Sequence, residues 1–232
     1  MKKFYTCVIA LIFSVGVFAQ DIPNHEYLNF SWYRPTGYGL PDFRDAHSED
    51  IRFARQFNNG FHFGGSFAIG SNFYINKMNW VDGLRMGINA EYIEFSANYL
   101  KGEYQYIVSD EKFHDVHGKI SPKVGIVISY MPLKIMKMDL FVRWAPAFGV
   151  WYMYDEEHSY NFYGYEKLEN TAFEYALNRF SFGFNYRISV IRIGVEYING
   201  VSKSSIEYDG FTKSPRNFKD DVFKLNFGFN FE

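Results

Sequence analysis

The sequence predicts an all-β fold: an eight-stranded antiparallel up-and-down transmembrane β-barrel with an irregular N-terminal extension. After Asn59, apolar and polar residues alternate with period 2 in eight segments, which is how barrel strands read in sequence. Aromatic residues make up 21% of the 232 residues, more large rings than the core of a soluble domain of this size can enclose. After residue 20 no apolar stretch is long enough for a membrane-spanning helix, so any crossing must be made by strands.

The N-terminus is expected to be a secretory signal peptide over residues 1–20. It begins Met1-Lys2-Lys3, continues with an apolar stretch at 8–18 and ends in small residues before the first acid. This arrangement is typical of an exported protein, and the apolar stretch is shorter than the roughly 20 residues that span a bilayer. The single cysteine, Cys7, lies inside this segment. We therefore expect no disulfide and no thiolate metal site in the mature chain.

Residues 21–58 differ in composition from the rest of the chain. They contain Pro23, Pro35 and Pro41 and a charged run at 42–55. Because proline cannot donate to a strand ladder, we expect an N-terminal periplasmic extension here. The outer-membrane barrel is then expected to occupy residues 59–232.

The expected strands each place large apolar side chains on one face and polar or small side chains on the other. They lie within residues 61–73, 84–90, 93–99, 124–130, 140–152, 180–186, 191–197 and 223–231. A slip of phase at Lys101-Gly102 predicts a bulge. Pro146 predicts a bulge or bend inside the fifth strand.

Loop lengths predict the orientation of the barrel. Short connections are expected near 90–92, 132–137 and 187–189, and long polar ones near 74–82, 109–117, 155–171 and 202–220. Bacterial barrels have short periplasmic turns and long outer loops. We therefore expect an outer-membrane location with both ends of the mature chain in the periplasm.

The pattern resembles a known group of membrane proteins. The eight segments, the glycine-rich stretch 60–71 and the aromatic end from Phe227 to Phe231 are similar to small outer-membrane β-barrels. This group includes the OmpA transmembrane domain, OmpW and the PorT-like barrels of Bacteroidota. The resemblance covers residues 59–232 and implies a porin-like barrel in a Gram-negative outer membrane, in contact with its lipid and lipopolysaccharide.

The inward faces of the expected strands carry charges of both signs. An eight-stranded barrel is just wide enough for its side chains to fill it, and an unpaired buried charge is costly. We therefore expect a salt-bridged plug, with a narrow gated ion path as the alternative. The expected lumen charge network consists of Arg85, Glu94, Lys123, Arg143, Arg187, Arg192, Glu196 and Lys224.

Other candidate sites give weaker signals. The aromatic residues Tyr160, Phe162, Tyr163 and Tyr165 in an expected outer loop are candidates for surface contact, and packing of this loop on the barrel rim is the alternative. His114 and His117 have residue types that bind metals, but a solvated loop explains them better. His158-Ser159 has residue types found in hydrolase triads, but a triad is defined by geometry.

These observations favour a non-enzymatic structural, anchoring or surface-binding component within a larger envelope complex. No catalytic set, cofactor or metal is expected, and the formal net charge of -2 argues against nucleic acid as a partner. A protein partner is expected to bind through residues 21–58 or the outer loops. Two alternatives stay open, a small pore for ions or apolar solutes and a lipid A modifying enzyme.

Overall fold

The computed structural model describes residues 25–35, 61–75, 84–105, 110–133, 135–155, 170–208, 211–212 and 216–231. All regular structure in these ranges is β-strand. No helix among them is long and apolar enough to cross a membrane. The strands are β1 (His25–Pro35), β2 (Phe61–Tyr74), β3 (Leu84–Gln105), β4 (Asp110–Ile120), β5 (Lys123–Leu133), β6 (Met136–Trp144), β7 (Ala147–Asp155), β8 (Asn170–Ile188), β9 (Ile191–Tyr208), β10 (Phe211–Thr212), β11 (Arg216–Lys219) and β12 (Val222–Phe231).

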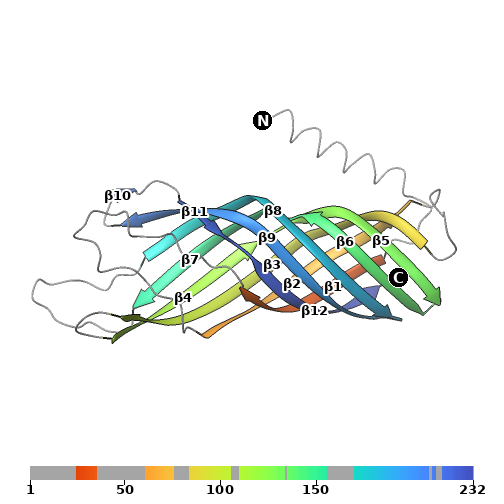
Figure 1. The fold of residues 1–232 in the computed structure, drawn as a ribbon, viewed down its shortest axis with the longest axis horizontal. Coiled ribbons are helices and arrows are strands. Elements are labelled where there is room, and N and C mark those ends of the chain that lie inside the picture. Colours follow the sequence, from red (N-terminus) through yellow and green to blue (C-terminus); the bar gives the residue numbers. More distant parts are fainter. Residues whose placement is uncertain are drawn as a thin grey trace, which may run out of the picture.

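The strands form a closed antiparallel barrel (Figure 1). Each of β4–β5, β6–β7 and β11–β12 is one barrel strand with a short interruption, because its two parts pair one after the other with a common neighbour, β3, β8 and β9 respectively. Around the ring, β1 pairs with β2, β2 with β3, β3 with β4–β5, and this strand with β6–β7. The ring continues through β8, β9 and β12, and β12 pairs with β1. The predicted eight-stranded up-and-down barrel is thus confirmed.

The predicted number of eight strands is right, but two errors cancel in it: one strand was missed, and two predicted strands are parts of a single one. The barrel begins with β1, in the region expected to be a periplasmic extension, because β1 pairs with both β2 and β12. The segments 84–90 and 93–99, expected as two strands joined by a short turn, are one continuous strand, β3. The rest of the expected extension, and the expected signal peptide, lie outside the described residues.

A β-bulge at Tyr92 explains why β3 resembles two strands in sequence. Its pairing with β2 passes from Ile93 directly to Glu91, so Tyr92 is the extra residue. A bulge of one residue exchanges the two faces of a strand. Glu91 and Glu94 are therefore both buried inside the barrel. The expected bulge at Lys101-Gly102 is absent, since the pairing of β3 with β4 runs through it without a shift.

Two prolines, Pro122 and Pro146, interrupt barrel strands without changing their course. The expected irregularity at Pro146 is confirmed, because β6 ends before it and β7 begins after it. There the Ser121 hydroxyl donates to the Pro146 carbonyl oxygen at 2.8 Å. The Ala145 amide donates to the Arg179 carbonyl oxygen at 2.8 Å, across from a register shift in β8. Backbone groups at the break thus keep hydrogen-bond partners.

The two faces of the wall have opposite chemistry. On β12, exposed and buried residues alternate strictly, with Phe231 54% exposed and Asn230 buried. The same arrangement repeats around the ring. A continuous apolar outer face of this extent is unusual for a monomeric soluble protein. Exposed charged side chains among the described residues lie toward the strand ends, at Glu26, Arg34, Lys203 and Lys219.

The two ends of the barrel differ in their connections. At one end, the Ser189 amide of the β8–β9 turn donates to the Ile135 carbonyl oxygen of the β5–β6 turn at 2.8 Å. The Asn230 amide, near the end of the chain, donates to the Val190 carbonyl oxygen. We call this the short-turn end; it lies beside the C label in Figure 1. Ser189 has a φ of 53°, a left-handed conformation that suits a tight turn.

At the opposite end, called the long-loop end, the chain connects successive strands through 36–60, 106–109, 156–169 and 209–215. Two loop predictions were wrong. The connection expected outside at 74–82 follows β2 and precedes β3, which places it at the short-turn end, because the barrel has an additional strand before it. Of the long loop expected at 109–117, residues 110–117 belong to β4.

Candidate functional site

Six charged side chains meet in the middle of the lumen. We call them the central network: Glu91, Glu94, Lys123, Arg143, Glu196 and Lys224. They come from β3, β5, β6, β9 and β12, which lie far apart in sequence, and none of the six side chains is more than 3% exposed. The closed ring therefore brings them together.

Lys123 is the centre of this network. Its Nζ lies 2.7 Å from Glu91 Oε1, 2.8 Å from Glu94 Oε2 and 3.1 Å from Glu196 Oε1. One ammonium group thus contacts three carboxylates on two strands. Hydrogen bonds between ionised groups are stronger than neutral ones.

The two other cations complete the network. Arg143 Nη1 lies 2.9 Å from Glu91 Oε2, and Arg143 Nη2 lies 2.6 Å from Glu196 Oε1. Lys224 Nζ donates to both carboxylate oxygens of Glu94, at 2.6 Å to Oε2. Three cations and three anions leave the central network with no net charge. Because its members pair across the interior, they close the barrel at mid-height.

The structure places the eight residues of the expected lumen network in three positions. Five of them belong to the central network, namely Glu94, Lys123, Arg143, Glu196 and Lys224. Arg187 and Arg192 lie nearer the short-turn end, and Arg85 is a half-buried residue near the start of β3. Glu91 was missed because it was assigned to a turn. Its signal in the sequence was the exchange of apolar and polar faces around Tyr92.

Nearer the long-loop end lies a second buried cluster that sequence reasoning did not find. Lys119 Nζ is 2.6 Å from Glu174 Oε1 and 2.8 Å from Asp220 Oδ2. His117 stacks on Trp151, with ring centroids 4.1 Å apart, and its Nε2 lies 3.1 Å from Glu174. Local sequence patterns could not pair these residues, because they come from different strands.

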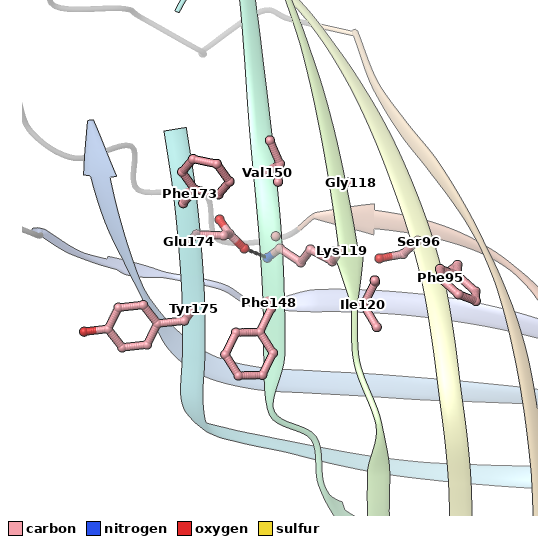
Figure 2. Close-up of a pocket in the computed structure, with 11 residues that line it drawn as sticks. Phe95, Ser96, Gly118, Lys119, Ile120, Phe148, Val150, Phe173, Glu174 and Tyr175 are labelled. Atoms are coloured by element: carbon pink, nitrogen blue, oxygen red, sulfur yellow. Dashed lines mark ion pairs between the residues drawn. The ribbon is translucent and has the colours of Figure 1, made fainter. Parts of the chain in front are cut away.

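At this level the outer wall has an apolar groove of about 620 Å³ (Figure 2). Its floor includes Gly118, where an added Cβ would have no atom within 4 Å. In Figure 2 the Lys119–Glu174 ion pair crosses between strands that also carry the groove's apolar side chains. Those side chains are Phe95, Ile120, Phe148, Val150, Phe173 and Tyr175. The groove therefore offers an apolar surface suited to hydrocarbon chains.

A third group of side chains lies toward the short-turn end. Arg187 Nη2 donates to Asp139 Oδ1 at 2.7 Å, and Arg187 Nε lies 2.7 Å from Asp139 Oδ2 as an ion contact. Arg187 also donates to the Tyr74 hydroxyl at 2.9 Å. The Ser129 hydroxyl donates to the Asp139 carboxylate. The Arg187 guanidinium is thus held by a charged hydrogen bond and an ion contact to one carboxylate.

The histidines considered as candidates for a metal site or a hydrolase triad are only partly within the described residues. Among the described residues, no group of three or more side chains could hold a metal ion. His117 is a buried residue in the lumen, packed on Trp151 and next to Glu174. His158 and Ser159 lie outside the described residues, as do the candidate contact residues Tyr160, Phe162, Tyr163 and Tyr165.

Comparisons with known proteins found structural likeness alone. No family model and no curated protein matches the chain. A major outer membrane protein from Thermus thermophilus is similar with a TM-score of 0.45 and 10% identity, over 89% of this chain and 99% of that one. Ail, the attachment invasion locus protein of Yersinia pestis, gives a TM-score of 0.36 at 9% identity, covering 90% and 97%. OprG from Pseudomonas aeruginosa gives 0.34 at 13% identity, covering 90% and 96%. All three TM-scores are below 0.5, and these likenesses are too low to assign a function to this chain.

Proposed function

We propose that this protein is a non-enzymatic barrel of a Gram-negative outer membrane, with a structural, anchoring or surface-binding role. The central network carries the proposal, because six fully paired charges fill the lumen where a solute path would have to run. The apolar outer face supports insertion in lipid, where only helices and closed barrels satisfy their backbone. Assignment to the barrels of Bacteroidota stays a prediction from the sequence.

Conductance in planar bilayers tests the closed lumen. The purified full-length protein is expected to give no discrete current steps, since the paired side chains occupy the middle of the lumen. A water-filled porin that is purified and reconstituted in the same way serves as the positive control. Regular steps from this protein would replace the proposed role by the alternative of a small pore.

The proposed orientation places the short-turn end in the periplasm, because bacterial barrels have short periplasmic turns. Both ends of the mature chain then lie in the periplasm. Cysteine introduced at Lys219, near the long-loop end, is expected to react with a membrane-impermeant maleimide on intact cells. Cysteine introduced at Val190, in the β8–β9 turn, is expected to react only after the outer membrane is permeabilised. The opposite labelling pattern would invert the orientation.

A protein partner is proposed to bind at the long-loop end. Residues 36–60 leave β1 and enter β2 there, so the part of the expected extension beyond β1 is proposed to face the outside. Deletion of residues 21–58 would remove β1 and open the barrel. The suitable variant therefore replaces only 36–60 by a short Gly-Ser linker, with replacement of 156–169 as the matched control. Recovery of the same proteins with both variants and the wild type would exclude these two loops as the binding surface.

The proposal that the chain is not an enzyme is tested on lipid A. The mass spectrum of lipid A from cells that express the protein is expected to match that of cells without it. A change that disappears with His158→Ala would favour the alternative of a lipid A modifying enzyme.

A further inference from the structure

Near the short-turn end, three basic side chains face the lumen side by side. Lys137 on β6 is directly opposite Arg187 on β8, and Arg187 is directly opposite Arg192 on β9. We call these residues the cationic row; all three are buried, with Arg192 only 1% exposed. Like charges at opposed positions of neighbouring strands repel one another. A buried charge without a counterion is costly, so this row requires negative charge nearby.

The described residues supply too little of that charge. Asp139 is the carboxylate that pairs with the row, and both of its oxygens contact Arg187. Lys137 Nζ and the Nε and Nη1 atoms of Arg192 have no hydrogen-bond partner, and neither residue makes an ion pair with a described residue. This contrasts with the central network, in which cations and anions balance.

Aromatic rings account for only part of the environment of the unpaired cations. Lys137 Nζ lies 3.9 Å from the centre of the Tyr74 ring, and the Arg192 guanidinium lies 3.9 Å from that of Tyr27. A ring face attracts a cation but leaves these nitrogens without a hydrogen-bond acceptor. The missing component is therefore an acceptor that also carries negative charge.

Neutral donors lie at the same end of the lumen. Asn185 precedes Arg187 on the same inward face of β8, and Asn230 is the last inward residue described on β12. Both side chains are buried, and neither amide nitrogen nor amide oxygen has a hydrogen-bond partner. Asn230 lies directly opposite Tyr27, whose ring packs on Arg192.

We infer that the cationic row is the binding site of a small soluble oxyanion of the phosphate type, which enters from the aqueous compartment at the short-turn end. Such an anion carries enough oxygens to accept from an ammonium, a guanidinium and an amide together, and its charge offsets the repulsion within the row. The site faces the lumen, on the opposite side of the wall from the lipid-facing residues. This inference goes beyond a structural role, because it gives the barrel a ligand.

The test is binding of inorganic phosphate to the full-length protein in a non-ionic detergent, by calorimetry at constant ionic strength. One phosphate is expected per chain. Arg192→Gln is expected to weaken binding at least tenfold, and Arg34→Gln, on the outer face near the other end, is expected to leave it unchanged. Lys137→Gln serves as a second variant should Arg192→Gln fail to fold.

Equilibrium unfolding gives an independent measurement. Phosphate is expected to raise the urea midpoint of the wild type, because a ligand that binds only the folded state stabilises it. Without phosphate, Arg192→Gln is expected to unfold at the same midpoint as the wild type or a higher one, since it relieves repulsion. With phosphate, its midpoint is expected to stay unchanged.

Three results would overturn the inference. The first is a lack of saturable phosphate binding to the wild type. The second is binding that Arg192→Gln and Lys137→Gln both leave intact. The third is stabilisation by micelles containing phosphatidylglycerol in phosphate-free buffer but not by inorganic phosphate, which would make the ligand a lipid headgroup.

Discussion

Replacing Lys123 by methionine tests the central network most directly. The change removes three ion contacts of 2.7, 2.8 and 3.1 Å and leaves three buried carboxylates with two cations. Breaking a buried ion pair by removing one partner costs about 3–5 kcal/mol. We expect a loss of this size in the free energy of unfolding. Methionine retains much of the length of the lysine side chain, so a cavity contributes little to the effect.

The assay is equilibrium urea unfolding in phospholipid vesicles, followed by tryptophan fluorescence and far-ultraviolet circular dichroism. Lys203→Met is the matched control, because Lys203 is an exposed residue of β9, and its replacement is expected to change stability by less than about 0.5 kcal/mol.

A second replacement separates charge balance from packing. In the double variant Lys123→Met/Glu196→Gln, Glu91 keeps Arg143 and Glu94 keeps Lys224, so the network is neutral again. We expect its loss of stability to be smaller than the sum of the two single losses by about 1–3 kcal/mol, as for coupled neighbours. Strictly additive losses, or a Lys123→Met variant as stable as the wild type, would refute a coupled ionic plug.

Three further tests probe other parts of the barrel in the same unfolding assay. Gly70→Ala is expected to cost about 1–3 kcal/mol, because its Cβ would lie 2.5 Å from both the Ala90 carbonyl oxygen and the Tyr27 hydroxyl oxygen. Gly118→Ala has open space and is the control, and equal effects would contradict the reasoning. On the lipid face, Val195→Arg at mid-height is expected to cost about 2–4 kcal/mol and Ile191→Arg next to the turn about 0–1 kcal/mol, whereas equal small costs would argue against insertion. Asp139→Asn is expected to cost about 3–5 kcal/mol, since it removes the carboxylate paired with the cationic row, and an unchanged midpoint would show that the row is neutralised by other means.

The first barrel strand, β1, has the alternating pattern of a barrel strand in its sequence, but the pattern was not recognised. In β1, Leu28, Phe30 and Trp32 alternate with inward Asn29 and Ser31, which is the period that identified the other strands. The prolines and the charged run around it favoured an irregular segment. β1 becomes identifiable as a barrel strand through its pairing with β12, at the far end of the chain.

Alternation along each strand was determined by the sequence alone, because the side chains of a strand point to opposite faces by local geometry. The inward positions of Lys123, Arg143 and Glu196 could therefore be predicted correctly. Where the apolar residues of a segment change from one face to the other, the chain contains either a turn or a bulge, and the sequence fits both. At Tyr92 the pairing of β3 with β2 showed that it is a bulge.

Which charges meet was decided by the tertiary structure. Register and ring closure join residues that are far apart in the chain, such as Lys224 with Glu94 and Lys119 with Asp220. No local pattern encodes those distances, so the balanced central network and the unbalanced cationic row were indistinguishable in sequence. They differ because closing the barrel places three carboxylates among the central cations and, in the described part of the chain, only Asp139 beside the row.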